Sequence, residues 1–321
     1  MAKKYLDPKA DLTFKKVFGE HPDLVTSLLN ALLPFKKGEE IESVEYLSPE
    51  LVPENPLRKF SIVDVRCRDN RGRQFLVEMQ MVWSREFEQR VMFNSAKAYV
   101  RQLDSKEEYH LIEPVYSLNI VNDIFEKDIS DYYHYYRMVH EKHTDKVIDG
   151  LHLVFVELPK FTPQTISEKK MQVLWLRYLT EIEERTKEVP QELLDNPEIS
   201  KALTVVEESA YTEAQMLAYD KFWDIIRTER TFYNSAHRDG FKEGRDAGLE
   251  AGLEEGRKVG IEEGRKEGIK EGIKEGIKEG IKEGLEKEKI ETIKRLKSNG
   301  FDIATIAIAT GMSEEDIMRF L

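Results

Sequence analysis

The sequence predicts an α/β layer fold for the first 160 residues, and three observations support this prediction. Two helical patterns, at 11–19 and 22–33, come first. A third helical pattern begins near Ser84 and lies between strand-like stretches. These stretches, rich in β-branched and apolar residues, fall at 60–67, 73–82, 115–121 and 151–158. Helices and strands in this order pack as layers of sheet and helix rather than as an all-helical bundle.

The ends of the predicted helices carry recognisable signals. The first helix is DLTFKKVFG, in which Asp11 opens the helix and suits an N-cap position. Gly19 suits the residue that follows its last turn, where glycine adopts a left-handed conformation. The second helical pattern ends before Pro34, and Ser84 is a good N-cap for the third helix.

The strands at 60–67 and 73–82 are joined by the turn-rich segment RDNRG and are expected to form a hairpin. Side chains alternate between the two faces of a strand, so apolar positions mark the face toward the core. That apolar face is expected to hold Val63, Val65, Cys67, Phe75, Val77 and Met79. Asp64, Glu78 and Gln80 then share the opposite face. If the turn centres on residue 71, Asp64 and Glu78 stand directly opposite one another, about 5 Å apart at Cβ.

Two carboxylates this close repel each other unless a proton or a cation lies between them. Their hard oxygen atoms suit Mg²⁺, which commonly binds one or two carboxylates together with water and substrate phosphates. A bound ion would acidify a coordinated water and polarise a phosphoryl oxygen. Arg90, Lys97 and Arg101 follow at spacings that place them on one face of the third helix, where they could contact a phosphate backbone.

The same residues also fit an ordinary solvated hairpin, because acidic residues on the exposed face of an antiparallel strand are common. The charge distribution along the chain is likewise compatible with a functional site or with a solvated hairpin. The chain has a net charge of −12, whereas the segment from Arg58 to Arg101 holds ten basic and five acidic residues. A basic segment in an acidic protein favours a local polyanion-binding surface over general coating of nucleic acid.

The pattern of Asp64, thirteen residues and then Glu78-Met79-Gln80 resembles the PD-(D/E)XK nuclease signature, with glutamine at the lysine position. Together with the DLTFKKVFG helix, the helix after the second motif strand and a glycine-periodic tail, it resembles the Rpn family of recombination-promoting nucleases and transposase-like proteins. This resemblance covers nearly the whole chain.

The resemblance implies a restriction-endonuclease-like core, with a mixed central sheet flanked by helices, that cleaves DNA with Mg²⁺. Asp64 and Glu78 correspond to the metal ligands, Gln80 to the catalytic lysine, and Asp11 to an acidic residue on the first helix. Glutamine is neutral and cannot supply the positive charge of lysine to a transition state. Either activity is reduced or a nearby base such as Lys97 or Arg90 takes that place.

The rest of the chain divides by composition. We expect a nuclease-like core at 1–160, a helical extension at 161–238, a glycine repeat at 239–284 and a helical end piece at 285–321. The repeat has twelve glycines at a period of four, from Gly240 to Gly284. Each helical glycine costs about 1 kcal/mol relative to alanine. The repeat is therefore either a helix that associates through its glycine stripe or a partly disordered spacer.

The end piece, GFDIATIAIATGMSEEDIMRFL, predicts two short helices that break at Gly311, with Ser313 as the N-cap of the second. It resembles a helix-turn-helix element. Arg319 is the only basic residue of 300–321, which favours packing or oligomerisation over the reading of DNA.

Several classes of protein are excluded. No run of about 18 apolar residues exists, so a membrane-spanning helix is not expected, and the amino terminus lacks the pattern of a secretory signal. Cys67 is the only cysteine, which excludes an intrachain disulfide framework and suggests a reducing, cytoplasmic location. Taken with the family resemblance, the sequence predicts a Mg²⁺-dependent DNA endonuclease associated with recombination or mobile elements, with a homo-oligomerising tail. The alternative is a non-catalytic DNA-binding or assembly protein with a degenerate nuclease core.

Overall fold

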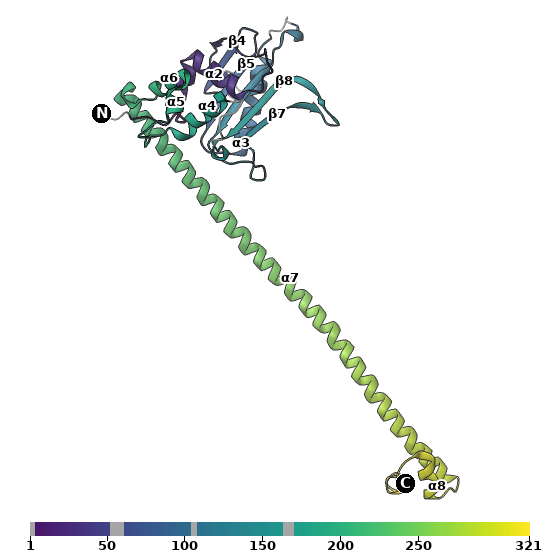
Figure 1. Ribbon diagram of the computed structural model, residues 1–321. Coiled ribbons are helices and arrows are strands. Elements are labelled where there is room, and N and C mark those ends of the chain that lie inside the picture. The colour runs from purple at the N-terminus through teal and green to yellow at the C-terminus, as the bar shows by residue number, and fades with distance from the viewer. Residues whose placement is uncertain (1–3, 52–60, 104–107, 163–169) are drawn as a thin grey trace. The chain divides into compact units, whose positions relative to one another are not determined.

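The computed structural model describes residues 4–51, 61–103, 108–162 and 170–321. The chain forms two compact units, Met1–Asn234 and Ser235–Leu321, and helix α7 (Glu213–Ser298) contributes to both (Figure 1). The first unit contains the sheet and the helices that cover it. The second contains most of α7 and two short helices.

The centre of the first unit is a mixed six-stranded sheet with the order β1-β4-β5-β6-β8-β7. Strands β1, β4 and β5 are antiparallel to their neighbours in this order. Strands β5, β6 and β8 are parallel to one another, and β7 pairs antiparallel with β8 at the other edge. The strands are β1 (Val44–Tyr46), β4 (Val65–Asp69), β5 (Gln74–Gln80), β6 (Val115–Val121), β7 (Tyr133–His140) and β8 (His143–Glu157). This confirms the predicted fold class, a mixed central sheet flanked by helices.

One predicted strand is divided in two by the structure. Residues 60–67 were expected to form a single strand, but β3 (Ser61–Ile62) pairs with β2 (Glu50–Leu51) in a separate small sheet, and β4 begins only at Val65. The chain changes direction at Val63 and Asp64. Val63 therefore packs with Leu76 and Ala98 beneath α3, and its predicted place beside Val65 was wrong.

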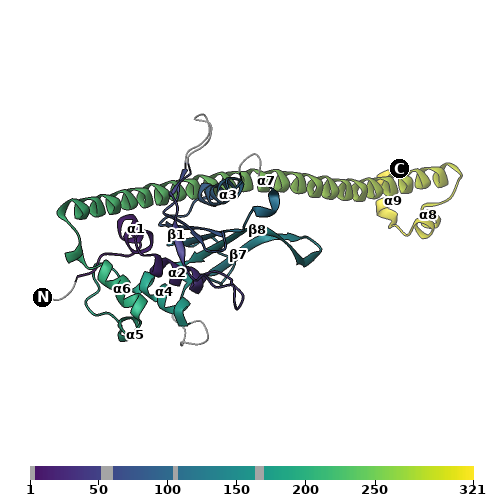
Figure 2. The ribbon, with the colours of Figure 1, turned by 90° about the horizontal axis from the view of Figure 1, so that it is seen from above.

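The largest core lies on the face of the sheet away from α3. Figure 2 shows α3 on one side of the sheet and α2 and α4 on the other. Alternate strand residues such as Val65 and Val77 point into this core, where they meet fully buried helix residues such as Phe18 and Trp175. The helices of this layer are α1 (Asp11–Gly19), α2 (Pro22–Leu32), α4 (Lys170–Glu181), α5 (Gln191–Leu194) and α6 (Pro197–Val205).

Helix α3 (Arg85–Val100) covers the opposite face of the sheet. The hydroxyl of Ser84 accepts a hydrogen bond from the backbone N–H of Phe87 at 3.2 Å, as expected for its N-cap. Buried residues of α3, including Phe87 and Val91, pack on strand residues of this face such as Phe155. Glu78 alternates with Leu76 along β5 and so lies on this face, beneath α3.

Two predictions for the first helix were wrong in detail. Ala10 occupies the N-cap position of α1, and Asp11 is its first helical residue, whose carboxylate forms an ion pair with Lys15. Gly19 is the last residue of the helix and is followed by Glu20 at the C-cap, which adopts a right-handed conformation. Asp11 therefore does not act as the N-cap of α1.

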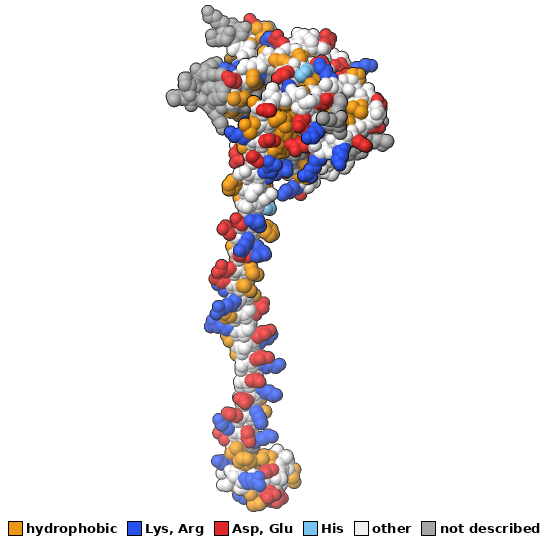
Figure 3. Space-filling model, turned by 90° about the vertical axis from the view of Figure 1, so that its left-hand side faces the viewer, with side chains coloured by type: hydrophobic (Ala, Val, Ile, Leu, Met, Phe, Trp, Pro, Cys, Tyr) orange, Lys and Arg blue, Asp and Glu red, His pale blue; other side chains and the backbone are white. Residues whose placement is uncertain are grey.

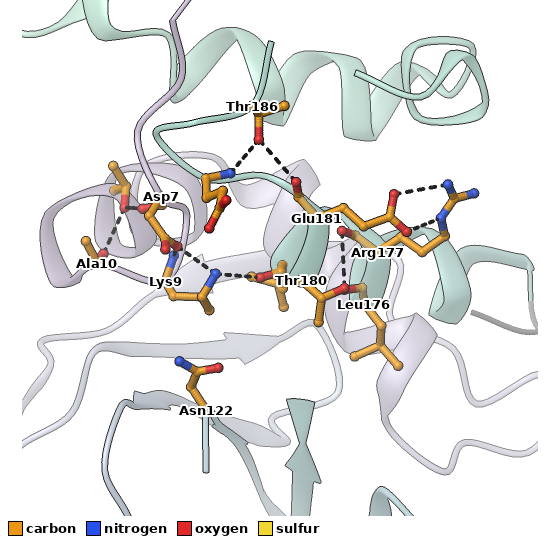
Figure 4. A network of polar contacts seen from close by, with 12 residues as sticks. Asp7, Lys9, Ala10, Asn122, Leu176, Arg177, Thr180, Glu181 and Thr186 are labelled. Atoms are coloured by element: carbon orange, nitrogen blue, oxygen red, sulfur yellow. Dashed lines mark hydrogen bonds and ion pairs between the residues drawn. The ribbon is translucent and has the colours of Figure 1, made fainter. Parts of the chain in front are cut away.

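A buried ion pair fixes the segment before α1. Lys9 Nζ lies 2.8 Å from Asp7 Oδ1 and donates to the carbonyl oxygen of Leu179 at 2.9 Å (Figure 4). The Asp7 backbone N–H donates to Tyr219 Oη at 2.9 Å. Burial raises the pKa of Asp7, although the adjacent Lys9 opposes this rise. These bonds hold the chain start against the end of α4 and against the first turns of α7.

The first turns of α7 belong to the first unit and pack beside the end of β5. Ile226 packs with Met81 and Val82, and partly buried Phe222 and Trp223 extend the same cluster. Three short 3-10 helices complete the described part of this unit, at Tyr109–Leu111, Leu158–Lys160 and Glu208–Ala210.

The glycine repeat is a continuous part of α7, so the structure gives it helical order. Its side chains are exposed throughout, with acidic, basic and apolar side chains interspersed along the helix (Figure 3). After α7, Ile306 of α8 (Ile303–Thr310) and Ile317 of α9 (Glu314–Phe320) pack on Ile293. Gly311 (φ 65°) ends α8 in the left-handed conformation, and Ser313 caps α9, as predicted. None of the described helices is both long and apolar enough to cross a membrane.

Candidate metal centre

The hairpin of β4 and β5 brings Asp64 and Glu78 together in the register that the sequence predicts. Val65 pairs with Val77 and Cys67 with Phe75, so the extension of this register places Asp64 opposite Glu78. Asp64 lies just before β4, where its carboxylate turns back toward the partner strand. Its Oδ2 accepts a hydrogen bond from the backbone N–H of Met79 at 2.8 Å, which holds the carboxylate beside β5. We call Asp64 and Glu78 the carboxylate pair.

The environment of the carboxylate pair disfavours two negative charges. Glu78 is only 6% exposed, and burial together with the charge of Asp64 raises its pKa to about 7. Burial also raises the pKa of Asp64, although the hydrogen bond from Met79 and the charge of Lys15 oppose the rise. Buried carboxylates with raised pKa values are typical of sites that bind cations or move protons.

Lys15 is a residue of this site that the sequence reasoning missed. Its Nζ lies 2.6 Å from Asp11 Oδ1 and 3.6 Å from Asp64 Oδ1, so it links α1 to the carboxylate pair. Burial alone would lower the pKa of Lys15, but the contacts with Asp11 and Asp64 raise it. The spacing of Asp11 and Lys15 at i, i+4 was a signal for their pairing. The sequence held no signal that α1 packs beside β4.

Gln80 does not stand free at the lysine position. Its Nε2 donates to the carbonyl oxygen of Val82 at 2.7 Å, and its Oε1 accepts from Arg90 Nη2 at 2.8 Å. The same Arg90 nitrogen lies 3.6 Å from Glu78 Oε2. Gln80 therefore orients Arg90, which places one positive charge from α3 against the carboxylate pair.

Asn94 is the second residue that the sequence reasoning missed. It lies one turn after Arg90 on α3, is 1% exposed, and donates from Nδ2 to Glu78 Oε1 at 3.2 Å. Its spacing from Arg90, i and i+4, placed it on the same helix face. An asparagine in that position is ordinary in sequence, and only the packing of α3 over β5 directs it at Glu78.

The other two predicted basic residues lie farther along α3. Lys97 donates to the carbonyl oxygen of Leu51, and its Nζ is 3.4 Å from Ser61 Oγ, so it joins α3 to the small sheet. Arg101 follows the last helical residue as the C-cap of α3 and is exposed. Of the three predicted phosphate contacts, the structure brings Arg90 alone into contact with the carboxylate pair or Gln80.

The wider basic segment is largely occupied by other contacts. Arg68 pairs with Glu45, and Arg73 Nη2 lies 2.7 Å from Asp69 Oδ2 in a buried pair that closes the turn. Arg66 Nη2 donates to Gln74 Oε1 at 2.9 Å. Arg58 and Lys59 lie outside the described residues. Positive charge near the carboxylate pair thus comes from Lys15 and Arg90 rather than from the turn.

The carboxylate pair opens into a hollow of about 520 Å³, which we call the carboxylate hollow. It is lined by Ser61, Ile62, Asp64, Glu78, Met79, Gln80, Glu86, Gln89, Arg90 and Phe93. A larger hollow of about 610 Å³ lies beside α2, but none of its acidic residues is buried as Glu78 is. We therefore place the chemistry of this chain at the smaller hollow.

The donor set fits a hard divalent cation. Asp64, just before β4, and Glu78 of the neighbouring strand β5 offer oxygen ligands, and Mg²⁺ commonly takes one or two carboxylates and fills its other positions with water and phosphate. Among the described residues no three acidic, histidine or cysteine side chains converge as a ready ligand cluster. Asp11 instead binds Lys15 and approaches the carboxylate pair only through it.

Comparison with protein families gives a match that spans the part of the chain carrying this site. A family described as PD-(D/E)XK nuclease family transposase matches residues 8–229, which is more than half of the chain and includes the sheet, α3 and the carboxylate pair. Comparisons with curated proteins and with solved structures gave no match. The chain belongs to the PD-(D/E)XK nuclease family of transposases.

Proposed function

We propose that this member of the PD-(D/E)XK nuclease family is a Mg²⁺-dependent endonuclease that hydrolyses phosphodiester bonds of DNA. The observation that carries the proposal is the carboxylate pair, in which buried Glu78 of β5 and partly buried Asp64, just before β4, line one open hollow. Nuclease chemistry follows from the family. We propose in addition that the metal is Mg²⁺, that the substrate is DNA and that the strand is cut internally. We connect the activity with recombination or mobile elements because the family is one of transposases.

Asp64 and Glu78 would hold the metal ion. A divalent ion bound there would polarise a phosphoryl oxygen and lower the pKa of its water. Its charge would also offset the burial and the repulsion by Asp64 that together raise the pKa of Glu78 to about 7. Asn94 and the backbone N–H of Met79 hold one oxygen of each carboxylate by hydrogen bonds, which fixes the direction in which the remaining oxygens face.

Lys15 supplies the positive charge that Gln80 lacks. Its ammonium group lies 3.6 Å from Asp64 Oδ1, so it can stabilise negative charge on a phosphate held beside this carboxylate. In this proposal Asp11 is a positioning residue, because its 2.6 Å contact fixes the Lys15 side chain. This assignment replaces Lys97, which is engaged with Leu51, as the substitute for the motif lysine.

DNA would approach across the carboxylate hollow. Arg90 lies at the hollow with its side chain 44% exposed, and we propose that it contacts the scissile phosphate or its neighbour. Lys97 and Arg101 continue along and just past α3, where we propose that they contact phosphates farther along the strand. Contacts of this kind give affinity that falls as salt concentration rises.

Incubation of the purified chain with supercoiled plasmid and Mg²⁺ tests the proposal. We expect nicked or linear products, and we expect Asp64→Asn to abolish them. Asp131→Asn is the matched control, since Asp131 is an exposed carboxylate outside the hollow. Metal binding should be measured on the same proteins by isothermal titration calorimetry. Cleavage by Asp64→Asn at the rate of the unmodified chain would refute the assignment of the site.

We also propose that the chain forms homo-oligomers through its tail. Isoleucines of the glycine repeat are 53–59% exposed, at Ile269, Ile273, Ile277 and Ile281. Residues four apart on an α-helix are offset by about 40°, so the glycine and isoleucine stripes wind around α7. Contact with a second copy is therefore confined to a few repeats at a time. This association is also what the alternative function, a non-catalytic assembly protein, requires.

Light scattering separates the two functions when it is combined with the plasmid assay. We expect the full chain to have more than the mass of one copy and a chain that ends at Arg238 to be monomeric. An unchanged mass after truncation would remove the assembly role of the tail. Assembly without any metal-dependent cleavage would favour the non-catalytic alternative.

A further inference from the structure

An exposed aromatic ring stands at the rim of the carboxylate hollow. Phe93 is 45% exposed and lines the hollow together with Ile62, which is 52% exposed. Both apolar side chains therefore share one hollow with the carboxylate pair and Arg90. The nuclease chemistry proposed above uses neither of them.

The position of Phe93 follows from the face that α3 turns to the hollow. Glu86, Gln89, Arg90 and Phe93 recur at helical spacing and all line it. The adjacent Met92 is equally exposed, at 50%, but it lines a different hollow between α3 and the β7–β8 end of the sheet. The ring of Phe93 is thus set one turn after Arg90, the residue that faces the carboxylate pair.

One cationic group lies over this ring, and a second precedes it along α3. Lys97 Nζ lies 5.4 Å from the centre of the Phe93 ring, and Arg90 lies on the preceding turn. Positive charge attracts a phosphate backbone, and a flat apolar ring close to such charges offers a stacking surface to a base of the same strand. Aromatic rings interleaved with basic side chains are the usual surface for single-stranded nucleic acid.

We propose that Phe93 stacks on an unpaired nucleobase next to the scissile phosphate, so that the preferred substrate is DNA with single-stranded nucleotides at the cleavage position. The bases of an intact duplex are stacked on each other, and a ring at the backbone can reach one only after the base is extruded at a cost of a few kcal/mol. The inference rests on the proposed nuclease function and names its substrate class. Phe93 is the specificity-determining residue.

Binding without metal tests this inference separately from cleavage. Fluorescence anisotropy in EDTA compares a labelled single-stranded oligonucleotide with the blunt duplex of the same sequence. We expect tighter binding of the single strand. Phe93→Leu should weaken it by about 5- to 150-fold, the effect of one lost base–aromatic stack. Phe93→Trp, which retains a stacking ring, should keep the preference, and Met92→Leu on the adjacent position is the control.

A base analogue gives a direct readout of stacking. The fluorescence of 2-aminopurine falls when it stacks on a ring, so we expect one position of a scanned single strand to be quenched by the unmodified chain and released by Phe93→Leu. Equal binding of single strand and duplex, or an unchanged Phe93→Leu variant, would overturn the inference. Tighter binding of RNA of the same sequence would overturn DNA as the substrate.

The two proposals can fail independently. Plasmid cleavage together with an inert Phe93→Leu variant leaves the nuclease function intact and removes the stacking role. Single-strand preference that depends on Phe93, without any cleavage, supports the base-binding surface and refutes the nuclease activity. A loss of mass in light scattering on Phe93→Leu, with unchanged DNA binding, would show instead that the rim is an interface between copies.

Discussion

Replacement of Glu78 by glutamine should make the metal-free protein more stable at neutral pH. Burial and the charge of Asp64 raise the pKa of Glu78 from 4.5 to about 7 in the folded chain. The folded state therefore retains a proton that the unfolded state has lost, and stability falls as pH rises from about 4.5 to about 7. Above about pH 7 Glu78 is ionised in the folded chain as well, and the loss of free energy of unfolding has reached its full value. Glutamine has the shape of the protonated side chain and escapes the penalty.

The size of the effect follows from the shift. One pKa unit corresponds to about 1.36 kcal/mol, so the free energy of unfolding of Glu78→Gln should exceed that of the unmodified chain by about 3 kcal/mol at pH 8. At pH 4.5 the difference should shrink below about 1 kcal/mol, since the group is then protonated in the folded chain and half protonated in the unfolded one. Mg²⁺ should reverse the order at pH 8, because it binds the ionised pair and stabilises only the unmodified chain.

Urea unfolding in EDTA, followed by tryptophan fluorescence, measures this difference. All three tryptophans lie within 1–234, so the signal reports the unit that contains the site. Glu88→Gln, at an exposed position of helix α3, which covers Glu78 on β5, is the matched control and should leave stability nearly unchanged at both pH values. A Glu78→Gln variant that is no more stable than the unmodified chain at pH 8 would refute the claim that the carboxylate pair is electrostatically strained without metal.

Three further predictions concern other parts of the molecule. Lys15→Met should lower the cleavage rate at saturating Mg²⁺ by about 10²- to 10³-fold, because one charge-stabilising group is lost. Lys16 contacts Tyr211 instead, so Lys16→Met should have little effect on the rate. Equal rates for both variants in a plasmid assay would remove Lys15 from the mechanism. Asn94→Leu should weaken Mg²⁺ binding about 10- to 100-fold in calorimetry because Glu78 loses its hydrogen-bond donor, and an unchanged affinity would contradict that role. Gly276→Ala should raise the helical circular dichroism signal on heating and stabilise α7 locally by about 0.5–1 kcal/mol, because no described atom lies within 4 Å of the added Cβ. A loss of helical signal would indicate that this glycine is packed closely against a second copy.

Sequence patterns predicted much of the fold because they report interactions between residues close in the chain. Alternation along 73–82 and the turn at 68–72 fixed which residues face each other across the hairpin, and the pairing of Val65 with Val77 agrees. Ser84 and Gly311 marked helix ends through local hydrogen bonding and backbone conformation. Val63 was misplaced because strand alternation assumes an unbroken strand, whereas the chain leaves the small sheet after Ile62 and joins the six-stranded sheet only at Val65.

The site itself was predictable only in part, for a physical reason. Asp64, Glu78 and Gln80 are neighbours through strand pairing, and strand pairing leaves a period of two in the sequence. Lys15 and Asn94 reach the same place from helices packed on opposite faces of the sheet, and the rotation of a helix about its axis is set by the side chains buried beneath it. The sequence alone thus determined which carboxylates meet. Tertiary packing decided that Glu78 is buried, that the ammonium group of Lys15 lies beside Asp64, and that Phe93 stands exposed at the same hollow.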